Sequence, residues 1–376
     1  MSIYKYSNIK KPAIYVPLFD YYQSIGKVKY TEQADILKDI HLLNPTKTHY
    51  PEIEYGQDTV YEVKADAGSF GTYKEWEDSD GYIYIFILGH NLKKMNCGIN
   101  IELLYDGQTY QPDITSTYPI VNYNQFTDSS GTPDWNGFSI FKTKYNVTST
   151  NSAIDGFRIR IRPFSPTGAN EFIKLGCVSI CKKWTPPHNP DLSVKMSREY
   201  DGVKTTQTKG GATLSNALYT RGGTFWANGY SWELSGSDDD YNNPSDMADR
   251  GRQRTLGRRN WDLTFSYLKP SDLMPEFESL DYYGVYNNIN ADDQEDAYSS
   301  YEEQLGRNIT TSNSFFAAVL NKVQGSHIPF IFQPNVTDPN NNADQWAICR
   351  FNQKKFGITQ KAPELYNMKL KIRESY

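Results

Sequence analysis

The pattern of hydrophobic and polar positions predicts a chain built mainly from short β-strands. Residues Gly81–Gly89 form an apolar run that is rich in β-branched and aromatic side chains and is bounded by glycines. Such a run predicts a central strand that is covered on both faces. In Phe157–Arg162, apolar residues alternate with arginines, which predicts a half-buried strand with a basic outer face. Trp261–Leu268 alternates in the same way.

Other segments add further strands and one helix to this prediction. In Ser314–Gln324 the apolar residues fall on one stripe at helical spacing, and Gly325 provides a stop. A helix among strands indicates an α+β organisation for the second half of the chain. The further strand candidates are Ile99–Tyr105, followed by the turn pair Asp106–Gly107, and Phe172–Cys181, Ile328–Gln333, Gln345–Asn352 and Tyr366–Arg373.

Proline placement predicts where the first domain ends. Three prolines fall within Trp184–Pro190, and proline cannot donate a hydrogen bond to a β-ladder. Glycine and clustered charge after this point indicate long loops and an extended arm. The predicted segments are an N-terminal arm (1–11), a β-sandwich domain (12–185), a linker (186–204) and a β-rich α+β domain (205–376) whose first part (205–260) is the arm.

Composition favours a protein that works through surfaces. Aromatic residues make up 14% of the chain, with 29 Tyr, and tyrosine suits both strands and protein interfaces. A net charge of −5 gives no general attraction to nucleic acid or acidic membranes. No apolar run approaches the roughly 20 residues that span a bilayer, and Met1–Lys11 lacks the apolar core of a signal peptide. We therefore expect the protein to be made and kept in a cytosol, or carried in a particle assembled there.

The four cysteines fit the same expectation. Cys177 and Cys181 would place both thiols on one face of a strand, whereas Cys97 and Cys349 are isolated in the sequence. No further Cys or His lies at zinc-finger spacing. We expect buried, reduced thiols and no metal site.

Several segments resemble those of bacteriophage virion proteins. Ile83–Leu92, which ends in Leu-Gly-His-Asn-Leu, resembles a signature of jelly-roll modules in phage tail and fibre proteins, which are similar to discoidin or carbohydrate-binding-module sandwiches. Arg259–Tyr267, Ile328–Pro334, Asp344–Phe351 and Leu365–Glu374 resemble segments of phage tail or baseplate-adaptor proteins.

The resemblance implies a mainly β fold with two parts. The N-terminal part would be an antiparallel jelly-roll-like β-sandwich, and the C-terminal part a β-rich α+β docking domain with one prominent helix. We therefore expect a virion structural protein of the tail or baseplate, assembled in the host cytoplasm. It would form a symmetric ring of like subunits and connect the tail to fibres or other tail proteins. We expect neither binding to nucleic acid nor insertion into a membrane.

Alternative functions are left open beside this one. The first is a carbohydrate-binding module of the tail that recognises a host glycan. Less favoured are a head decoration protein and a glycan-cleaving enzyme. The sequence has five histidines and lacks a hydrolase elbow, a zinc-protease helix and a phosphate loop. We therefore expect no catalytic residue and no cofactor.

The predicted arm carries the candidate interface residues. Its tryptophans would anchor in a neighbouring subunit, and its arginines would form salt bridges between subunits. Aspartates nearby nearly cancel the charge of these arginines, which argues against phosphate binding. The candidates are Trp226, Trp232, Arg250, Arg252, Arg254, Arg258 and Arg259.

Three residues are candidates for contact with a glycan. His90 and Asn91 follow the predicted central strand and could hydrogen-bond a sugar hydroxyl, although a tight turn explains them better. Trp135 lies in a turn-rich segment and could stack on a sugar ring, although a large aromatic there is more often an anchor for its own loop.

Overall fold

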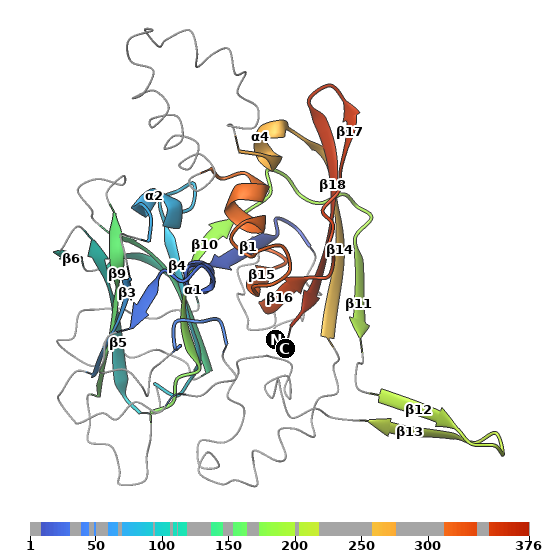
Figure 1. Ribbon diagram of the computed structural model, residues 1–376, viewed down its shortest axis with the longest axis horizontal. Helices are drawn as coiled ribbons and strands as arrows, with labels where there is room; N and C mark the ends of the chain where they lie inside the picture. The colour runs from blue at the N-terminus through green and yellow to red at the C-terminus, as the bar shows by residue number, and fades with distance from the viewer. Residues whose placement is uncertain are drawn as a thin grey trace, which may run out of the picture.

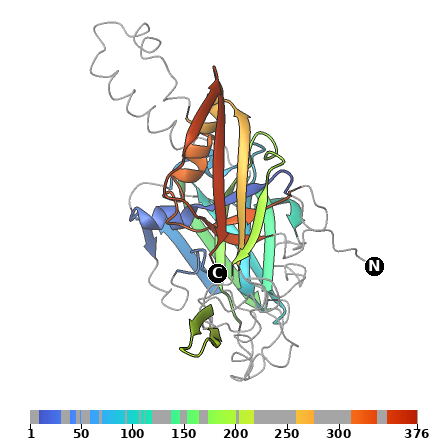
Figure 2. The same cartoon turned by 90° about the vertical axis from the view of Figure 1, so that its right-hand side faces the viewer.

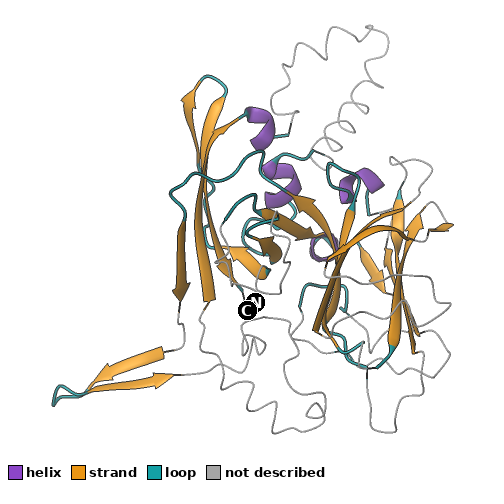
Figure 3. Ribbon diagram, turned by 180° about the vertical axis from the view of Figure 1, so that it is seen from behind, coloured by secondary structure: helices purple, strands orange, loops and turns teal. Residues whose placement is uncertain are grey.

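A computed structural model gives the fold of most of the chain. The residues that it describes are 9–30, 39–44, 49, 59–66, 70–92, 95–105, 108–110, 112–118, 137–145, 153–163, 173–199, 203–217, 258–275, 312–336 and 346–375. Strands account for 54% and helices for 10% of the structure, so the prediction of a mainly β fold is confirmed. Figure 3 shows how few helices accompany the sheets.

The strands fall into two large antiparallel sheets and one separate hairpin. Along the chain they are β1 (Ala13–Pro17), β2 (Val28–Tyr30), β3 (Thr59–Ala65), β4 (Ile83–His90), β5 (Cys97–Tyr105), β6 (Gln108–Tyr110), β7 (Pro112–Tyr118), β8 (Gly137–Tyr145), β9 (Ile154–Pro163), β10 (Cys177–Trp184), β11 (Lys195–Glu199), β12 (Val203–Gln207), β13 (Thr213–Ala217), β14 (Arg258–Leu268), β15 (Phe330–Gln333), β16 (Ala347–Phe351), β17 (Ile358–Ala362) and β18 (Leu365–Glu374). The helices are α1 (Leu18–Ser24), α2 (Tyr73–Trp76), α4 (Pro270–Leu273) and the π-helix η5 (Phe316–Leu320).

The first ten strands have the nested order of a jelly roll. The first strand, β1, pairs with the last, β10, and β3 pairs with the penultimate strand, β9. Inside these pairs, β4 lies beside β10 and β5 lies beside β9. One sheet therefore runs β1-β10-β4-β8-β7 and the other β2-β3-β9-β5-β6, and the two face each other across a common core (Figure 1). This arrangement agrees with the predicted antiparallel sandwich of jelly-roll type.

The apolar patterns explain which faces of these strands are buried. Every residue of β4 is buried, because Ile85 and Ile87 face the sandwich core while Phe86 and Leu88 enter a second cluster on the other side. The prediction of a strand covered on both faces is thus confirmed. Along β9, buried and half-buried positions alternate as the sequence predicts.

The sheet of β4 continues into the C-terminal half of the chain. Strand β15 pairs with the free side of β1, and β16, β18, β14 and β11 follow in that order, with β17 also on β18 (Figure 2). Strands on both sides of the predicted linker (186–204) therefore share one sheet and one core. The division of the chain into two domains stays a prediction.

The predicted linker (186–204) contains the strand β11. Strand β10 ends at Trp184, as the prolines predict, but β11 lies within the linker and pairs with β14. The intervening chain is also held in place, because Asp191 N donates to Thr264 O at 2.8 Å. β11 was missed because its charged sequence, Lys-Met-Ser-Arg-Glu, carries no apolar alternation.

The predicted helix is present but is wound differently from an α-helix. Residues Phe316–Leu320 form a π-helix, and Asn321 N donates to Phe316 O across five residues. The predicted apolar stripe is buried except at Phe316, which is half-buried, and the turns after the helix include Gly325, whose φ of +71° suits glycine. The position of the helix was therefore predicted correctly and its hydrogen-bonding pattern was not.

The four cysteines are free and buried, as expected. Burial raises the pKa of Cys97 to about 12 and also raises the pKa values of the other three thiols. In the described part of the chain, no helix is long and apolar enough to cross a membrane.

Candidate interface

A separate hairpin, β12–β13, extends away from both sheets (Figure 1). Its strands pair from Val203 with Ala217 to Gln207 with Thr213. The turn closes through a hydrogen bond from Thr208 N to Ala212 O at 2.8 Å. Within the turn, Gly211 has a left-handed backbone with φ of +84°, which glycine adopts without steric cost. Every described side chain of the hairpin is exposed except that of Thr208, which is half-buried. The described side chains of the hairpin therefore form no core.

Strand β11 forms the edge of the described sheet on the same side of the molecule. It pairs with β14 on one side only, and all five of its residues are exposed. Met196 lies opposite Trp261 in the register, and 54% of its surface is accessible. An open sheet edge presents unpaired backbone donors and acceptors.

Exposed apolar side chains occur on β11, on β14, on the hairpin and just before β11. Six large hydrophobic side chains are exposed among the described residues, and four of them lie between residues 192 and 267. Single exposed apolar side chains are common on protein surfaces, but on an open strand edge and on a separate hairpin they can contribute to a contact surface. The four residues are Leu192, Met196, Leu214 and Tyr267.

Tyr267 occupies an unusual backbone position at this edge. Between Phe265 and Leu268, β14 contains one more residue than its partner β18, which marks a β-bulge. The φ of Tyr267 is +63°, a left-handed conformation that a bulky residue adopts at a cost of about 1–2 kcal/mol. Its side chain is 74% exposed, so no packing within the described structure accounts for the aromatic ring.

The two described arginines of the predicted interface set lie on β14. Arg259 is held inside the chain: its backbone N donates to Glu374 Oε2 at 2.6 Å, and its side chain donates to Glu374 and to Trp346 O. Glu374 is buried, and burial raises its pKa although Arg259 opposes the shift. Arg258 is half-buried opposite Glu199. Trp226, Trp232, Arg250, Arg252 and Arg254 lie outside the described residues.

The candidate glycan contacts are not brought together at an open surface. His90 is fully buried at the end of β4, with Nε2 2.9 Å from Ser139 Oγ. Asn91 is also buried, and its Oδ1 accepts a hydrogen bond from Lys174 N at 2.8 Å. Neither side chain can reach a sugar in this conformation, and structural contacts explain both. Trp135 lies outside the described residues.

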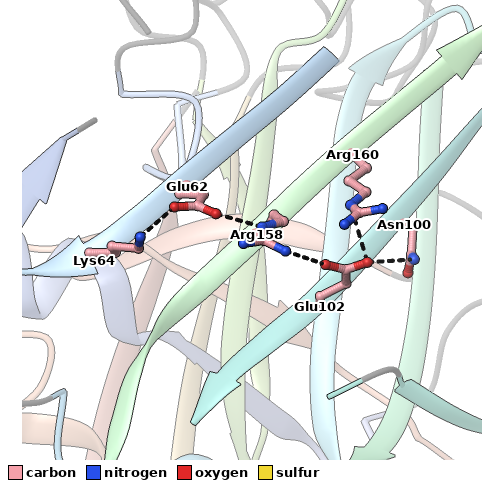
Figure 4. A network of polar contacts seen from close by, with 6 residues as sticks. All are labelled: Glu62, Lys64, Asn100, Glu102, Arg158 and Arg160. Carbon is pink, nitrogen blue, oxygen red and sulfur yellow. Dashed lines mark hydrogen bonds and ion pairs between the residues drawn. The ribbon is translucent and has the colours of Figure 1, made fainter. Parts of the chain in front are cut away.

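The predicted basic face of β9 is neutralised by its neighbours (Figure 4). Glu62 of β3 pairs with Arg158 at 2.5 Å and with Lys64 at 2.6 Å. Glu102 of β5 is fully buried and pairs with Arg158 at 3.3 Å and with Arg160 at 3.2 Å. The network ties three strands together and leaves no simple basic surface for an anionic partner.

A second charged cluster is buried where the jelly roll meets η5. Lys182 of β10 and Lys322, which follows η5, are both buried, and Lys322 Nζ lies 3.9 Å from Glu75 Oε2. Burial lowers the pKa of Lys182 to about 8, and the charge of Lys322 acts in the same direction. The carboxylates of Glu75, Glu77 and Asp78 oppose this shift. Burial of the charged Lys182 beside Lys322 therefore lowers the free energy of unfolding near neutral pH.

No group of three His, Cys, Asp or Glu side chains within the described residues could hold a metal ion. Comparisons with models of known protein families, with curated protein sequences and with solved structures found no match to this chain. The assignment to a virion therefore stays a prediction that rests on the resemblance in the sequence.

Proposed function

We propose that this protein is a non-enzymatic structural subunit that assembles with copies of itself in the tail or baseplate of a bacteriophage. The observation that carries the proposal is that hairpin β12–β13 belongs to neither large sheet and, like β11 and β14, exposes a large apolar side chain. An isolated two-stranded hairpin is at best marginally stable in water. A subunit interface would supply the packing that the described residues of the single chain do not give it.

The composition and the charge pairing support the same function. Tyrosine is enriched at protein interfaces, and the chain contains 29 tyrosines. The charges on the outer face of β3, β5 and β9 are paired with one another, which leaves that face suited to solvent. The virion, the tail and a link to fibres come from the resemblance of the strand segments to phage proteins.

Size-exclusion chromatography with light scattering tests the assembly step. The full chain should form a closed oligomer at micromolar concentrations. A variant in which residues 203–217 are replaced by a short Gly-Ser linker should remain monomeric and keep the same circular dichroism spectrum. A full chain that stays monomeric at all concentrations would contradict assembly with itself.

Immunogold electron microscopy tests whether the protein is part of a virion tail. Antibodies against the chain should label the tail or its base on phage particles whose genome encodes it. Label on the head, or an absence of label, would exclude the tail assignment even if the isolated chain forms oligomers.

The carbohydrate-binding alternative is not favoured by any described residue. A jelly-roll sandwich hosts many functions, so the fold by itself selects none. The two described candidates for glycan contact, His90 and Asn91, are buried.

A further inference from the structure

We infer that hairpin β12–β13 of one copy adds to the open edge of β11 in the next copy and extends that sheet by two strands. The inference deepens the proposed function, on which it rests, because it identifies the two surfaces that meet. Both surfaces lie in one chain, and each lacks the partner that the other could provide.

The acceptor is the outer side of β11. In an antiparallel pair, only part of each strand's backbone groups point toward the partner, so the free side of an edge strand keeps donors and acceptors available. β11 pairs with β14 without a register shift from Lys195 to Glu199, so its free side is a regular strand edge. A regular edge of this kind can accept a further antiparallel strand.

The donor is β13 rather than β12. β11 carries Lys195, Arg198 and Glu199, and like charges on facing strands destabilise a pair. β12 contains Lys204, whereas Thr213–Ala217 in β13 contains no charged residue. β13 can therefore lie beside β11 without placing a further cation next to Lys195 or Arg198.

An apolar side chain on each surface supports the match. Leu214 of β13 is 60% exposed and Met196 of β11 is 54% exposed. Met196 lies opposite Trp261, which is buried in the core, so a leucine placed beside Met196 would continue that core beyond the present edge. Strand pairing would then bury both side chains, in agreement with their apolar character.

The contact would be heterologous, since β11 and β13 are different surfaces. Each copy would donate its hairpin to one neighbour and accept a hairpin from the other. A repeated heterologous contact closes into a ring or continues as a filament, depending on the rotation between copies. The expected symmetric ring is one of these two outcomes.

The hairpin does not cover β11 of its own chain in this structure. Only residues 200–202 separate β11 from β12, yet the two strands belong to different sheets. Figure 1 shows the hairpin continuing beyond the end of β11 rather than turning back along it. Among the described residues, no strand therefore covers the outer edge of β11, and folding back of the hairpin within one chain is an outcome that the test must separate.

Crosslinking of single-cysteine variants tests the contact. Met196→Cys and Leu214→Cys are prepared separately in the full chain, mixed and treated with a short bismaleimide. The four native cysteines are buried, so the introduced thiols are the ones open to reaction. We expect covalent dimers from the mixture. A matched mixture of Leu214→Cys with Thr359→Cys, which is exposed on β17, should give only background crosslinking.

The remaining outcomes separate this inference from the proposed function. An oligomer by light scattering without crosslinks from the mixture would overturn strand addition at β11 and leave assembly intact. Crosslinks from Met196→Cys alone would indicate symmetric edge-to-edge pairing and also overturn it. Crosslinking within single molecules of the double variant at high dilution would show that the hairpin folds back on its own chain. A chain that stays monomeric would contradict both the proposed assembly and strand addition at β11.

Discussion

The hydroxyl of Tyr15 on β1 donates a hydrogen bond to Oε1 of Gln333 on β15 at 2.8 Å. The two residues are 318 positions apart, and both are buried. The bond lies at the junction where the jelly-roll sheet becomes the C-terminal sheet. It links the two halves of the chain by a side-chain contact in addition to the backbone pairing.

Tyr15→Phe should lower the free energy of unfolding by about 1 kcal/mol, because a buried hydrogen bond is lost while the ring is kept. Urea unfolding followed by tryptophan fluorescence measures the change. The matched control is Tyr267→Phe, where the same atom is removed from an exposed side chain and stability should stay unchanged. Equal effects in the two variants would contradict a stabilising role for the bond.

Tyr267 offers a test of why a bulky residue occupies a left-handed backbone position. Tyr267→Gly should stabilise the separated subunit by about 1 kcal/mol, because glycine adopts this φ without a steric penalty. The same variant should assemble less well, because the exposed ring is lost from the edge region. Thermal unfolding and light scattering measure the two effects.

Tyr267→Ala separates the ring from the backbone. Alanine keeps the steric penalty, so this variant should weaken assembly without a gain in stability. Unchanged assembly in both variants would show that the ring has no role at the edge.

Lys182 should make stability depend on alkaline pH. Its pKa is about 8 in the folded chain and 10.5 in the unfolded chain, so the unfolded state binds more protons between these values. The free energy of unfolding should therefore rise with pH from about 8 toward 10.5, by about 3 kcal/mol in total from this residue. Below pH 8 the cost of burying the charge is present in full.

The comparison with Lys182→Met isolates this contribution, because other groups titrate equally in both proteins. The variant should be more stable than the natural chain near pH 7, and the difference should shrink as the pH rises to 10. Lys371→Met, at an exposed position of β18, should show no such pH dependence. A constant difference across the pH range would place Lys182 in a solvated environment.

Glu102 should contribute more to stability than any other member of the network in Figure 4. Glu102→Gln leaves two arginines facing a neutral group at a fully buried site, and loss of one partner of a buried ion pair costs about 3 kcal/mol or more. Glu62→Gln is the matched control. Arg158 keeps Glu102 in that variant, and the site is partly exposed, so the loss should be about 1 kcal/mol or less. Equal losses in urea unfolding would show that burial does not distinguish the two carboxylates.

The strands that could be predicted are those whose burial follows from the pattern of apolar and polar residues within the strand itself. β4 and β9 were found because a continuous apolar run and a strict alternation each permit one kind of burial. The pairing of β1 with β15 could not be found, because the pattern of a strand does not identify a partner more than 300 residues away. β11 was missed since an exposed edge strand needs no apolar side.

The surroundings of the candidate site residues could not be predicted for a similar reason. His90 and Asn91 were singled out by residue type, but their burial depends on Ser139 and Lys174, which come from distant segments. Glu102 was not singled out, because its two arginine partners lie on another strand. Exposed Met196, Leu214 and Tyr267 could be recognised only after the core was known, since apolar residues in a sequence are expected to be buried.

The place of β18 in the sheet has a consequence for synthesis of the chain. β18 lies between β14 and β16, yet the ribosome makes it after both. Until residues Leu365–Glu374 leave the ribosome, no strand connects β14 and β11 to the rest of the sheet. The position of the hairpin that follows β11 is therefore not yet fixed. A nascent or truncated chain would therefore carry the hairpin without presenting it in a fixed orientation. In the proposed assembly, this order of synthesis would delay the contact between copies until β18 has been made.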